Sequence, residues 1–225
     1  MTVLVQGHAL RKSFARTEAL RGVSVEIGAG ETLAITGPSG SGKSTLLLCL
    51  AGILRPEAGE VTFDQQRLDL LGDADRTRLR RRQMGIVLQF GQLVPELTAA
   101  QNVALPLLLE KHDRATARRA ALSWLERLGA HDLADQVPAE LSGGQAQRVA
   151  VARALVTGPK VVFADEPTGA LDTVAGEQVL GQLLAAVRDT GATLVMVTHD
   201  NRVAARADRE IVLRDGSVEA AGVVS

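Results

Sequence analysis

The chain has 225 residues, 46% of them hydrophobic, and a formal net charge of -1 at pH 7. The apolar content is enough for a sizeable core, while the balanced charge argues against a surface built for nucleic acid. The single cysteine, Cys49, excludes an internal disulfide, and the apolar runs fall well short of the roughly 20 residues of a membrane span.

The first part of the chain alternates short apolar runs with turns. Four of these runs are predicted strands: Val23–Ile27, Thr32–Thr36, Glu60–Phe63 and Gly85–Leu88. The second strand leads into a glycine-rich loop, after which Thr45–Ile53 is predicted to continue as an apolar helix. A strand, a loop and a helix in this order form one unit of an α/β fold.

Residues 98–157 differ in composition, because Ala, Leu and Arg recur there with helical spacing. Helices are predicted over Arg114–Leu128 and Gln145–Val156. We expect a helical lobe at about residues 92–158, inserted in a single domain that spans residues 1–225.

The last third of the chain returns to alternating strands and helices. A predicted helix over Val174–Thr190 separates two predicted strands, Lys160–Ala164 and Thr193–Thr198. Two further runs, Ile211–Arg214 and Ser217–Ala220, flank an Asp-Gly pair and predict a closing β-hairpin. Short strands followed by helices imply a mainly parallel sheet with right-handed crossovers, so the predicted fold class is α/β.

The glycine-rich loop GPSGSGKST matches the phosphate-binding pattern G-x-x-x-x-G-K-[ST]. Its glycines let successive backbone N–H groups converge on phosphate oxygens at the start of a helix. The Lys43 ammonium is expected to reach the β- and γ-phosphates, and the Ser44 hydroxyl to ligate Mg²⁺. The predicted phosphate-binding residues are Gly37, Pro38, Ser39, Gly40, Ser41, Gly42, Lys43, Ser44 and Thr45.

A second apolar strand ends in two carboxylates, in the segment VVFADEP. Asp165 suits the coordination shell of the metal ion, and Glu166 can accept a proton from an attacking water molecule. An isolated Asp-Glu pair is usually surface charge, but the presence of a P-loop on the same chain favours the catalytic interpretation.

The segment LSGGQAQRVAVARAL, residues 141–155, places another glycine turn against the start of a helix. The free N–H groups at that helix start, together with the Ser142 hydroxyl, predict a second anion site. The alternative is a plain N-cap, which is the commoner role of Ser before a helix.

LSGGQ-x-QR, about twenty residues before VVFADEP, resembles the signature of the ATP-binding-cassette ATPases, and the resemblance covers essentially the whole chain. It implies a P-loop NTPase fold with a RecA-like parallel-sheet core, an N-terminal antiparallel β subdomain and an inserted α-helical subdomain. It also implies an ATPase that uses ATP and Mg²⁺. In this family two cassettes pair head to tail, so that each ATP is held by the P-loop of one subunit and the LSGGQ turn of the other.

The resemblance implies roles for further residues. Gln89 matches a glutamine that binds Mg²⁺ and faces the membrane partner, Asp172 matches the D-loop, and His199 matches a histidine that contacts the γ-phosphate. Phe14 matches the aromatic residue that stacks on adenine, a role more often filled by Tyr. The alternatives are ordinary polar residues at element ends and, for Phe14, a core position. The implied set at the signature turn is Ser142, Gly143, Gly144 and Gln145.

Within the family, residues 79–109 resemble the lipoprotein-releasing, macrolide-exporting and cell-division group of ATPases. Two residues depart from that group's pattern, since Leu88 replaces a Phe and Gln101 replaces a Glu. The group energises a permease with few membrane spans and a large extracytoplasmic domain. The resemblance therefore implies such a permease as partner, with a second copy of the ATPase and no nucleic acid.

These patterns imply a chain without a secretory leader that works at the cytoplasmic face of the membrane as a peripheral subunit. The alternative is a non-transport cassette ATPase of DNA repair, chromosome organisation or translation, but such chains usually carry a second cassette, zinc cysteines or long coiled coils. Nothing in the sequence names the cargo. The basic cluster at residues 76–82 suits either a membrane or partner contact or a solvated helix face, and we assign it no role.

Overall fold

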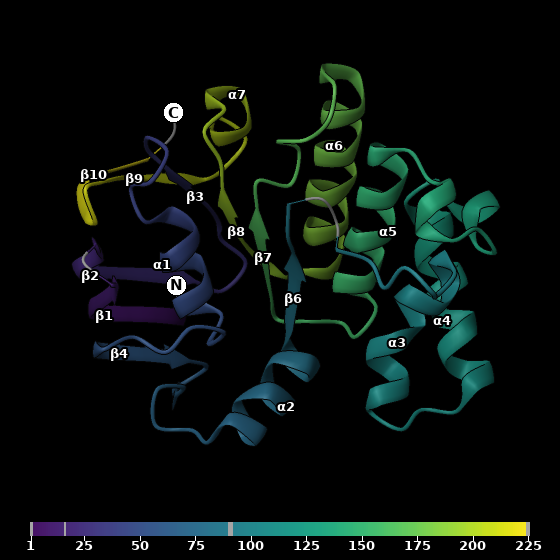
Figure 1. Cartoon of the computed structure of the whole chain (residues 1–225), viewed down its shortest axis with the longest axis horizontal. Helices are drawn as coiled ribbons and strands as arrows, with labels where there is room; N and C mark the ends of the chain where they lie inside the picture. Colours follow the sequence, from purple (N-terminus) through teal and green to yellow (C-terminus); the bar gives the residue numbers. More distant parts are fainter. Residues whose placement is uncertain (1, 16, 90–91, 224–225) are drawn as a thin grey trace. The chain divides into compact units, whose positions relative to one another are not determined.

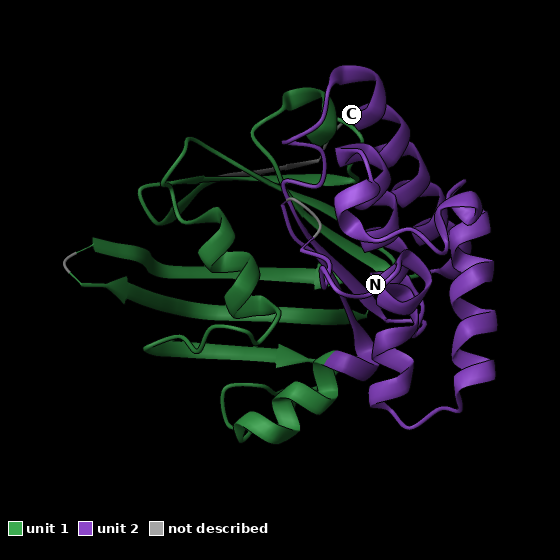
Figure 2. Ribbon diagram, turned by 45° about the vertical axis from the view of Figure 1, so that its right-hand side comes forward, with its two compact units in different colours: residues 1–80, 192–225 green, residues 81–191 purple. Residues whose placement is uncertain are grey.

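The computed structural model describes residues 2–15, 17–89 and 92–223. The described residues fall into two compact units, the first within residues 1–80 and 192–225 and the second within residues 81–191 (Figure 2).

The first unit begins with an antiparallel sheet of order β2-β1-β4-β5. Its strands are β1 (Val3–Phe14), β2 (Thr17–Gly28), β4 (Ala58–Phe63) and the short β5 (Gln66–Arg67) (Figure 1). Buried and exposed side chains alternate along much of β2, as expected for a sheet with one covered face. This sheet is the N-terminal antiparallel subdomain that the sequence predicts.

The other strands of the first unit are arranged around β3 (Thr32–Thr36), whose five residues are all buried. It pairs in parallel with β8 (Thr193–Val197) on one side and with β9 (Arg209–Arg214) on the other. The last strand, β10 (Ser217–Val223), forms the predicted hairpin with β9. Helix α1 (Lys43–Leu50) contacts both β1 and β8, so its buried leucines contribute to the core of this unit.

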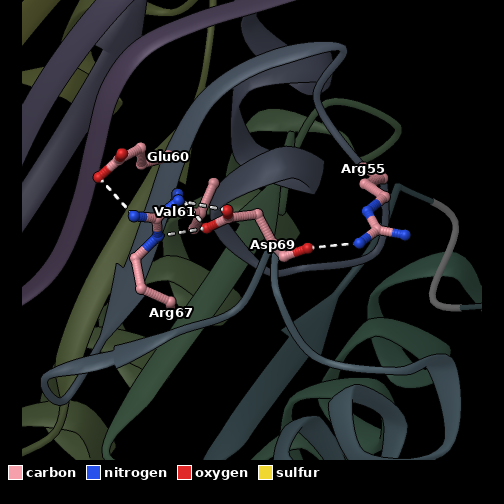
Figure 3. Close-up of polar contacts among 5 residues, drawn as sticks. All are labelled: Arg55, Glu60, Val61, Arg67 and Asp69. Atoms are coloured by element: carbon pink, nitrogen blue, oxygen red, sulfur yellow. Dashed lines mark hydrogen bonds and ion pairs between the residues drawn. The ribbon is translucent and has the colours of Figure 1, made fainter.

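An ion-pair cluster fixes the outer edge of the antiparallel sheet (Figure 3). Arg67 donates two hydrogen bonds to Asp69, of 2.9 and 2.5 Å, and pairs with Glu60 at 2.7 Å. Asp69 also accepts from the Val61 amide at 3.0 Å, and its carbonyl accepts from Arg55 at 2.6 Å. The hydrogen bond from Arg67 holds the pKa of Asp69 below its usual value, so the cluster stays ionised at neutral pH.

Cys49 lies on the buried side of α1. Burial raises the pKa of its thiol to about 11, because the thiolate is poorly solvated there. The residue is therefore a core side chain.

The second unit contains a parallel strand pair, β6 (Met84–Val87) and β7 (Val161–Asp165), and most of the helices. The helices are α3 (Ala99–Leu109), α4 (Arg114–Arg127), α5 (Gly143–Leu155) and α6 (Thr173–Thr190), with short 3₁₀ turns at His131–Leu133 and Pro138–Glu140. Helix α5 is central, since it contacts α3, α4, α6 and β6. Its approach to β6 is close enough that a Cβ at Gly85 would lie 2.4 Å from the Ala154 carbonyl oxygen.

Most observed elements follow the predicted ones with small shifts, but β2 begins at Thr17, six residues before the predicted start at Val23. Both helices that come after glycine turns begin two residues earlier than predicted, at Lys43 and Gly143. The sequence did not predict β1, β5 or the helices α2 (Asp73–Gln83) and α7 (Asn201–Ala204), and it gave no separate bounds for α3 within the helical lobe. None of the helices in the described part of the chain has the length and hydropathy that a membrane span requires.

The arginines at residues 76–82 lie on α2, and each has a partner within the chain. Arg76 is only 8% exposed and pairs with Asp73 at 2.5 Å, and Arg80 donates to the Gly52 carbonyl at 2.6 Å. Arg78 pairs with Asp75 at 3.2 Å, while both Arg81 and Arg82 pair with Glu110. The hydrogen bonds from Arg82 and Arg81 lower the pKa of Glu110. Each arginine of the cluster thus has an acidic or backbone partner, while Arg78 and Arg82 stay exposed.

Candidate functional site

In the first unit, residues 37–42 form a compact loop that runs directly into α1, whose first residues are Lys43, Ser44 and Thr45. Lys43 is buried, and its Nζ donates hydrogen bonds to the carbonyls of Gly37 at 2.9 Å and Pro38 at 2.8 Å. The helix has Gly42 at its N-cap and no acidic residue in its first turn. Its first amides, which have no partners within a helix, therefore remain suited to an anion.

Two glycines of this loop are required by the geometry. Gly37 has φ 135°, and a Cβ there would lie 2.0 Å from the Leu213 carbonyl oxygen. Gly42 has φ 100°, and a Cβ there would lie 2.2 Å from the Ala19 carbonyl oxygen. Only glycine combines this backbone conformation with such a close approach. The loop is thus a cradle of backbone groups that any side chain at these positions would obstruct.

Replacing Gly42 with Ala is expected to destabilise the protein far more than replacing Gly40 with Ala. Gly40 also has a positive φ, of 77°, but no atom lies within 4 Å of a Cβ placed there. Both changes incur the cost of a left-handed conformation, while only Gly42→Ala adds a clash. We therefore expect the free energies of unfolding of the two variants to differ by at least about 2 kcal/mol. Thermal unfolding of the two variants measures it; equal melting temperatures would contradict the close approach.

Phe14 and His199, the other predicted site residues of the first unit, are both exposed. The Phe14 side chain at the end of β1 is 48% exposed, with Lys12 Nζ 5.6 Å from its ring centre. The alternative of a core position is therefore wrong. His199 follows β8, next to Asp200, which accepts from the Arg202 amide and caps α7 (Asn201–Ala204). The Arg202 side chain also lowers the pKa of Asp200 through its hydrogen bonds, so a carboxylate lies beside His199 at neutral pH.

In the second unit, Asp165 is the last residue of β7 and Glu166 begins the turn that follows. Glu166 has φ 48°, a left-handed conformation that is uncommon for a residue with a Cβ. The turn closes through hydrogen bonds from the Gly169 amide to the Glu166 carbonyl and from the Leu171 amide to the Thr168 carbonyl, both of 3.1 Å. Both carboxylates are half-buried.

Gln89 and Glu166 are brought together around Gly169. A Cβ placed at Gly169 would lie 3.4 Å from Glu166 Oε2 and 3.6 Å from Gln89 Nε2. Gln89 itself is exposed beyond the end of β6. A polar amide thus lies near a carboxylate at this turn.

The signature turn, residues 142–145, starts α5 with a complete capping box. The Gln145 amide donates to Ser142 Oγ at 3.3 Å, and the Ser142 amide donates to Gln145 Oε1 at 2.8 Å. The N-cap interpretation is therefore correct. It does not exclude an anion site, because Ser142 and Gly143 are exposed and a capping box satisfies only some of the helix-start amides.

Asp172 caps the neighbouring helix α6, where its carboxylate accepts from the Ala175 amide at 2.9 Å. The two helix starts lie against each other, since a Cβ at Gly143 would be 3.3 Å from the Leu171 side chain and one at Gly144 would be 3.2 Å from Ala175 Cβ. Glycine at these two positions lets the signature turn approach the residues around Asp172.

The structure shows roles for residues that had none in the prediction from sequence. Buried Asn102 bonds the backbone of Val94, Leu97 and Thr98 and so fixes the loop before α3. Gln101 completes a capping box with Thr98, so its amide replaces the Glu of the related group without loss of the cap.

Arg153 and Gln147, both on α5, are two more such residues. The Arg153 guanidinium donates to the Gln92 carbonyl at 3.0 Å, and burial lowers its pKa. Gln147 is buried. Gln147 belongs to the motif LSGGQ-x-QR, so this motif could have indicated a role for it from the sequence.

Among the described residues, no group of three or more His, Cys, Asp or Glu could hold a metal ion. In nucleotide sites Mg²⁺ usually takes one or two protein ligands and completes its shell with phosphate and water oxygens. Ser44 in the first unit, and Gln89 and Asp165 in the second, each carry a side-chain oxygen, the kind of ligand that Mg²⁺ prefers.

Comparisons with known proteins identify the arrangement. The family model described as "ABC transporter" matches residues 20–169, more than half of the chain. A lipoprotein-releasing system ATP-binding protein, LolD of Shewanella sp. (strain MR-4), is 42% identical over 97% of this chain and 96% of its own length. An uncharacterised ABC transporter ATP-binding protein, YbbA of Escherichia coli (strain K12), is 44% identical over 96% of each.

Solved structures give the same result for the fold. The ATP-binding cassette MJ0796, in a dimeric post-hydrolysis state bound to ADP and Pi, has a TM-score of 0.92 and 39% identity over 99% of both chains. CbiO1 from Clostridium perfringens, part of the ABC transporter complex CbiONQ, has a TM-score of 0.88 and 32% identity over 100% of this chain and 90% of its own.

These matches support the predicted P-loop NTPase fold and a transporter ATPase, and they do not support the non-transport alternative. The protein is an ATP-binding and ATP-hydrolysing subunit, and the chain belongs to the ABC transporter family.

Proposed function

We propose that the chain hydrolyses ATP as one of two identical copies that pair head to tail, and that this pairing energises a membrane permease. The observation that carries the proposal is the occurrence of two exposed glycine turns, each at a helix start, in one chain. A single cassette needs one such turn for its own nucleotide. The second is accounted for if it closes the site of the other copy.

The P-loop binds the nucleotide in this proposal. The backbone amides of residues 37–45 and the start of α1 hold the β- and γ-phosphates, and the Lys43 ammonium exchanges its carbonyl partners for phosphate oxygens. Phe14, which is exposed, stacks on the adenine ring. His199 holds the γ-phosphate by a hydrogen bond.

Hydrolysis is in-line attack of water on the γ-phosphate, with Glu166 as the group that accepts the water proton. Ser44 and Gln89 would hold Mg²⁺, with Asp165 in its outer shell, and the ion would neutralise charge on the phosphates. Ser142, Gly143 and Gly144 of the second copy present helix-start amides to the same γ-phosphate. The free energy of ATP binding thus stabilises the pair, and hydrolysis releases it.

The proposed partner is a permease with few membrane spans and a large extracytoplasmic domain, contacted from the cytoplasmic face of the membrane. Support comes from residues 79–109 and from the relatives, one of which is named for a lipoprotein-releasing system and another as part of a transporter complex. On α3, within that segment, Leu108 and Leu109 are exposed. Residues 1–225 act as a single nucleotide-binding domain, with the helical subdomain at about 92–158.

The substitution Ser142→Arg tests the pairing. A long cation at the signature turn removes the cap and obstructs the γ-phosphate of the other copy, so ATPase activity is expected to fall about 100-fold or more. ATP affinity of the isolated chain is expected to stay within about twofold, because the P-loop is unchanged. Phosphate release and equilibrium ATP binding measure the two effects.

Ser123→Arg is the matched control. Ser123 is exposed on α4, so the substitution introduces the same arginine side chain away from the signature turn. It is expected to keep normal activity. If Ser142→Arg hydrolyses ATP at the wild-type rate, the signature turn does not take part in the site.

A further inference from the structure

A cavity of about 170 Å³ lies between the start of α5 and the turn that carries Glu166. On the α5 side it is lined by Gly143, Ala146 and Gln147, and on the other side by residues of the segment 166–171. It therefore adjoins both the signature turn and Glu166, the residue proposed to accept the proton of the attacking water.

One polar side chain in this cavity has an unmet hydrogen-bond donor. Gln147 is 4% exposed, and its Nε2 has no hydrogen-bond partner among the described protein atoms. A buried amide without a partner is strongly disfavoured, so native proteins supply one from protein or from ordered water. At about 30 Å³ per molecule, the cavity has room for several water molecules.

The turn opposite Gln147 contains a residue whose backbone conformation its surroundings must hold. Glu166 adopts a left-handed backbone conformation at φ 48°, and such conformations persist only where the surroundings hold them. Within the turn, its carbonyl accepts from the Gly169 amide at 3.1 Å. A carbonyl oxygen has a second lone pair, so the backbone of this turn still offers acceptors to a donor in the cavity.

We propose that Gln147 is a positioning residue for ATP hydrolysis, whose side-chain amide binds ordered water in this cavity and through it holds the Glu166 turn. This water-mediated link runs from α5 to the Glu166 turn within one copy of the chain. The state of the signature turn therefore bears on the orientation of Glu166. This inference rests on the proposed role of Glu166 as the group that accepts the water proton.

The substitution Gln147→Met tests it, because Met has a similar length and flexibility but no amide. We expect kcat to fall about tenfold while KM for ATP and the melting temperature change little, since a small displacement of a catalytic group lowers turnover without affecting nucleotide binding. A kcat within twofold of wild type would overturn the proposal.

Gln182→Met is the matched control. Gln182, on α6, also has a buried amide atom without a partner among the described residues, its Oε1, but it does not line the cavity. It is expected to leave kcat unchanged. If kcat falls equally in both variants, the loss is a general effect of replacing a buried glutamine, and the positioning role is overturned.

A crystal structure of the wild-type protein at high resolution tests the same claim without relying on a variant. We expect a water molecule within hydrogen-bond distance of Gln147 Nε2 that also contacts the backbone of residues 166–171, and a dry cavity would overturn the proposal. The role of Glu166 is judged separately. If Glu166→Gln keeps the wild-type rate, the proposed function fails, whereas an inactive Glu166→Gln beside a fully active Gln147→Met refutes only the inference.

Discussion

Replacing Glu166 with Gln is expected to lower ATP turnover by about 10²–10⁴-fold, the usual contribution of a general base. Gln keeps the size and polarity of the side chain but cannot accept the water proton at neutral pH. Because ATP still binds and is no longer consumed, the variant should accumulate as an ATP-bound pair. Phosphate release measures the loss, and size-exclusion chromatography with ATP and Mg²⁺ detects the pair.

The matched control for this change is Glu126→Gln, at an exposed position on α4. It removes one carboxylate and is expected to alter neither turnover nor the elution volume. A Glu166→Gln variant that remains monomeric with ATP, both alone and with its permease, would contradict the pairing mechanism.

Lys43→Ala is expected to weaken ATP binding by about 100-fold. The ammonium supplies charge-assisted hydrogen bonds to the phosphates, and losing interactions worth about 3 kcal/mol corresponds to that factor. The loop itself should remain folded, because Lys43 bonds its carbonyls without being required for the glycine conformations. Isothermal titration with ATP measures the affinity.

Lys111→Ala removes an exposed lysine from the connection after α3 and is the control for the loss of positive charge. Its ATP affinity should match that of the wild type. An unchanged affinity in Lys43→Ala would contradict the assignment of residues 37–45 as the phosphate-binding loop.

The parts of the fold that were predicted correctly have strong local causes. Strand β3 was predicted to the residue, because five buried residues end at a glycine turn. The P-loop was recognised because only glycine allows its backbone conformation at positions such as Gly37. Helix α5 was predicted to start late, since glycine carries no helical signal although it occupies the first turn of α5.

The parts that were missed depend on distant contacts. Helix α2 has almost no apolar periodicity, and its one buried side chain is an arginine, so its sequence resembles a solvated loop. The burial of Gln147 and the cavity beside it arise from packing between α5 and a turn some twenty residues away. No local sequence pattern indicates such a contact. For the same reason the sequence could not decide whether Phe14 is buried or exposed.

The central claim, that each P-loop works with the signature turn of another copy, is tested most directly by mixing two inactive variants. Lys43→Ala lacks a working P-loop, and Ser142→Arg lacks a working signature turn. In a mixed pair, one site combines the intact P-loop of one copy with the intact signature turn of the other. An equimolar mixture is then expected to regain about a quarter of the wild-type phosphate release, because half of the pairs are mixed and each has one intact site of two. If the mixture stays at the background rate of the separate variants at every ratio, the two turns do not act between copies.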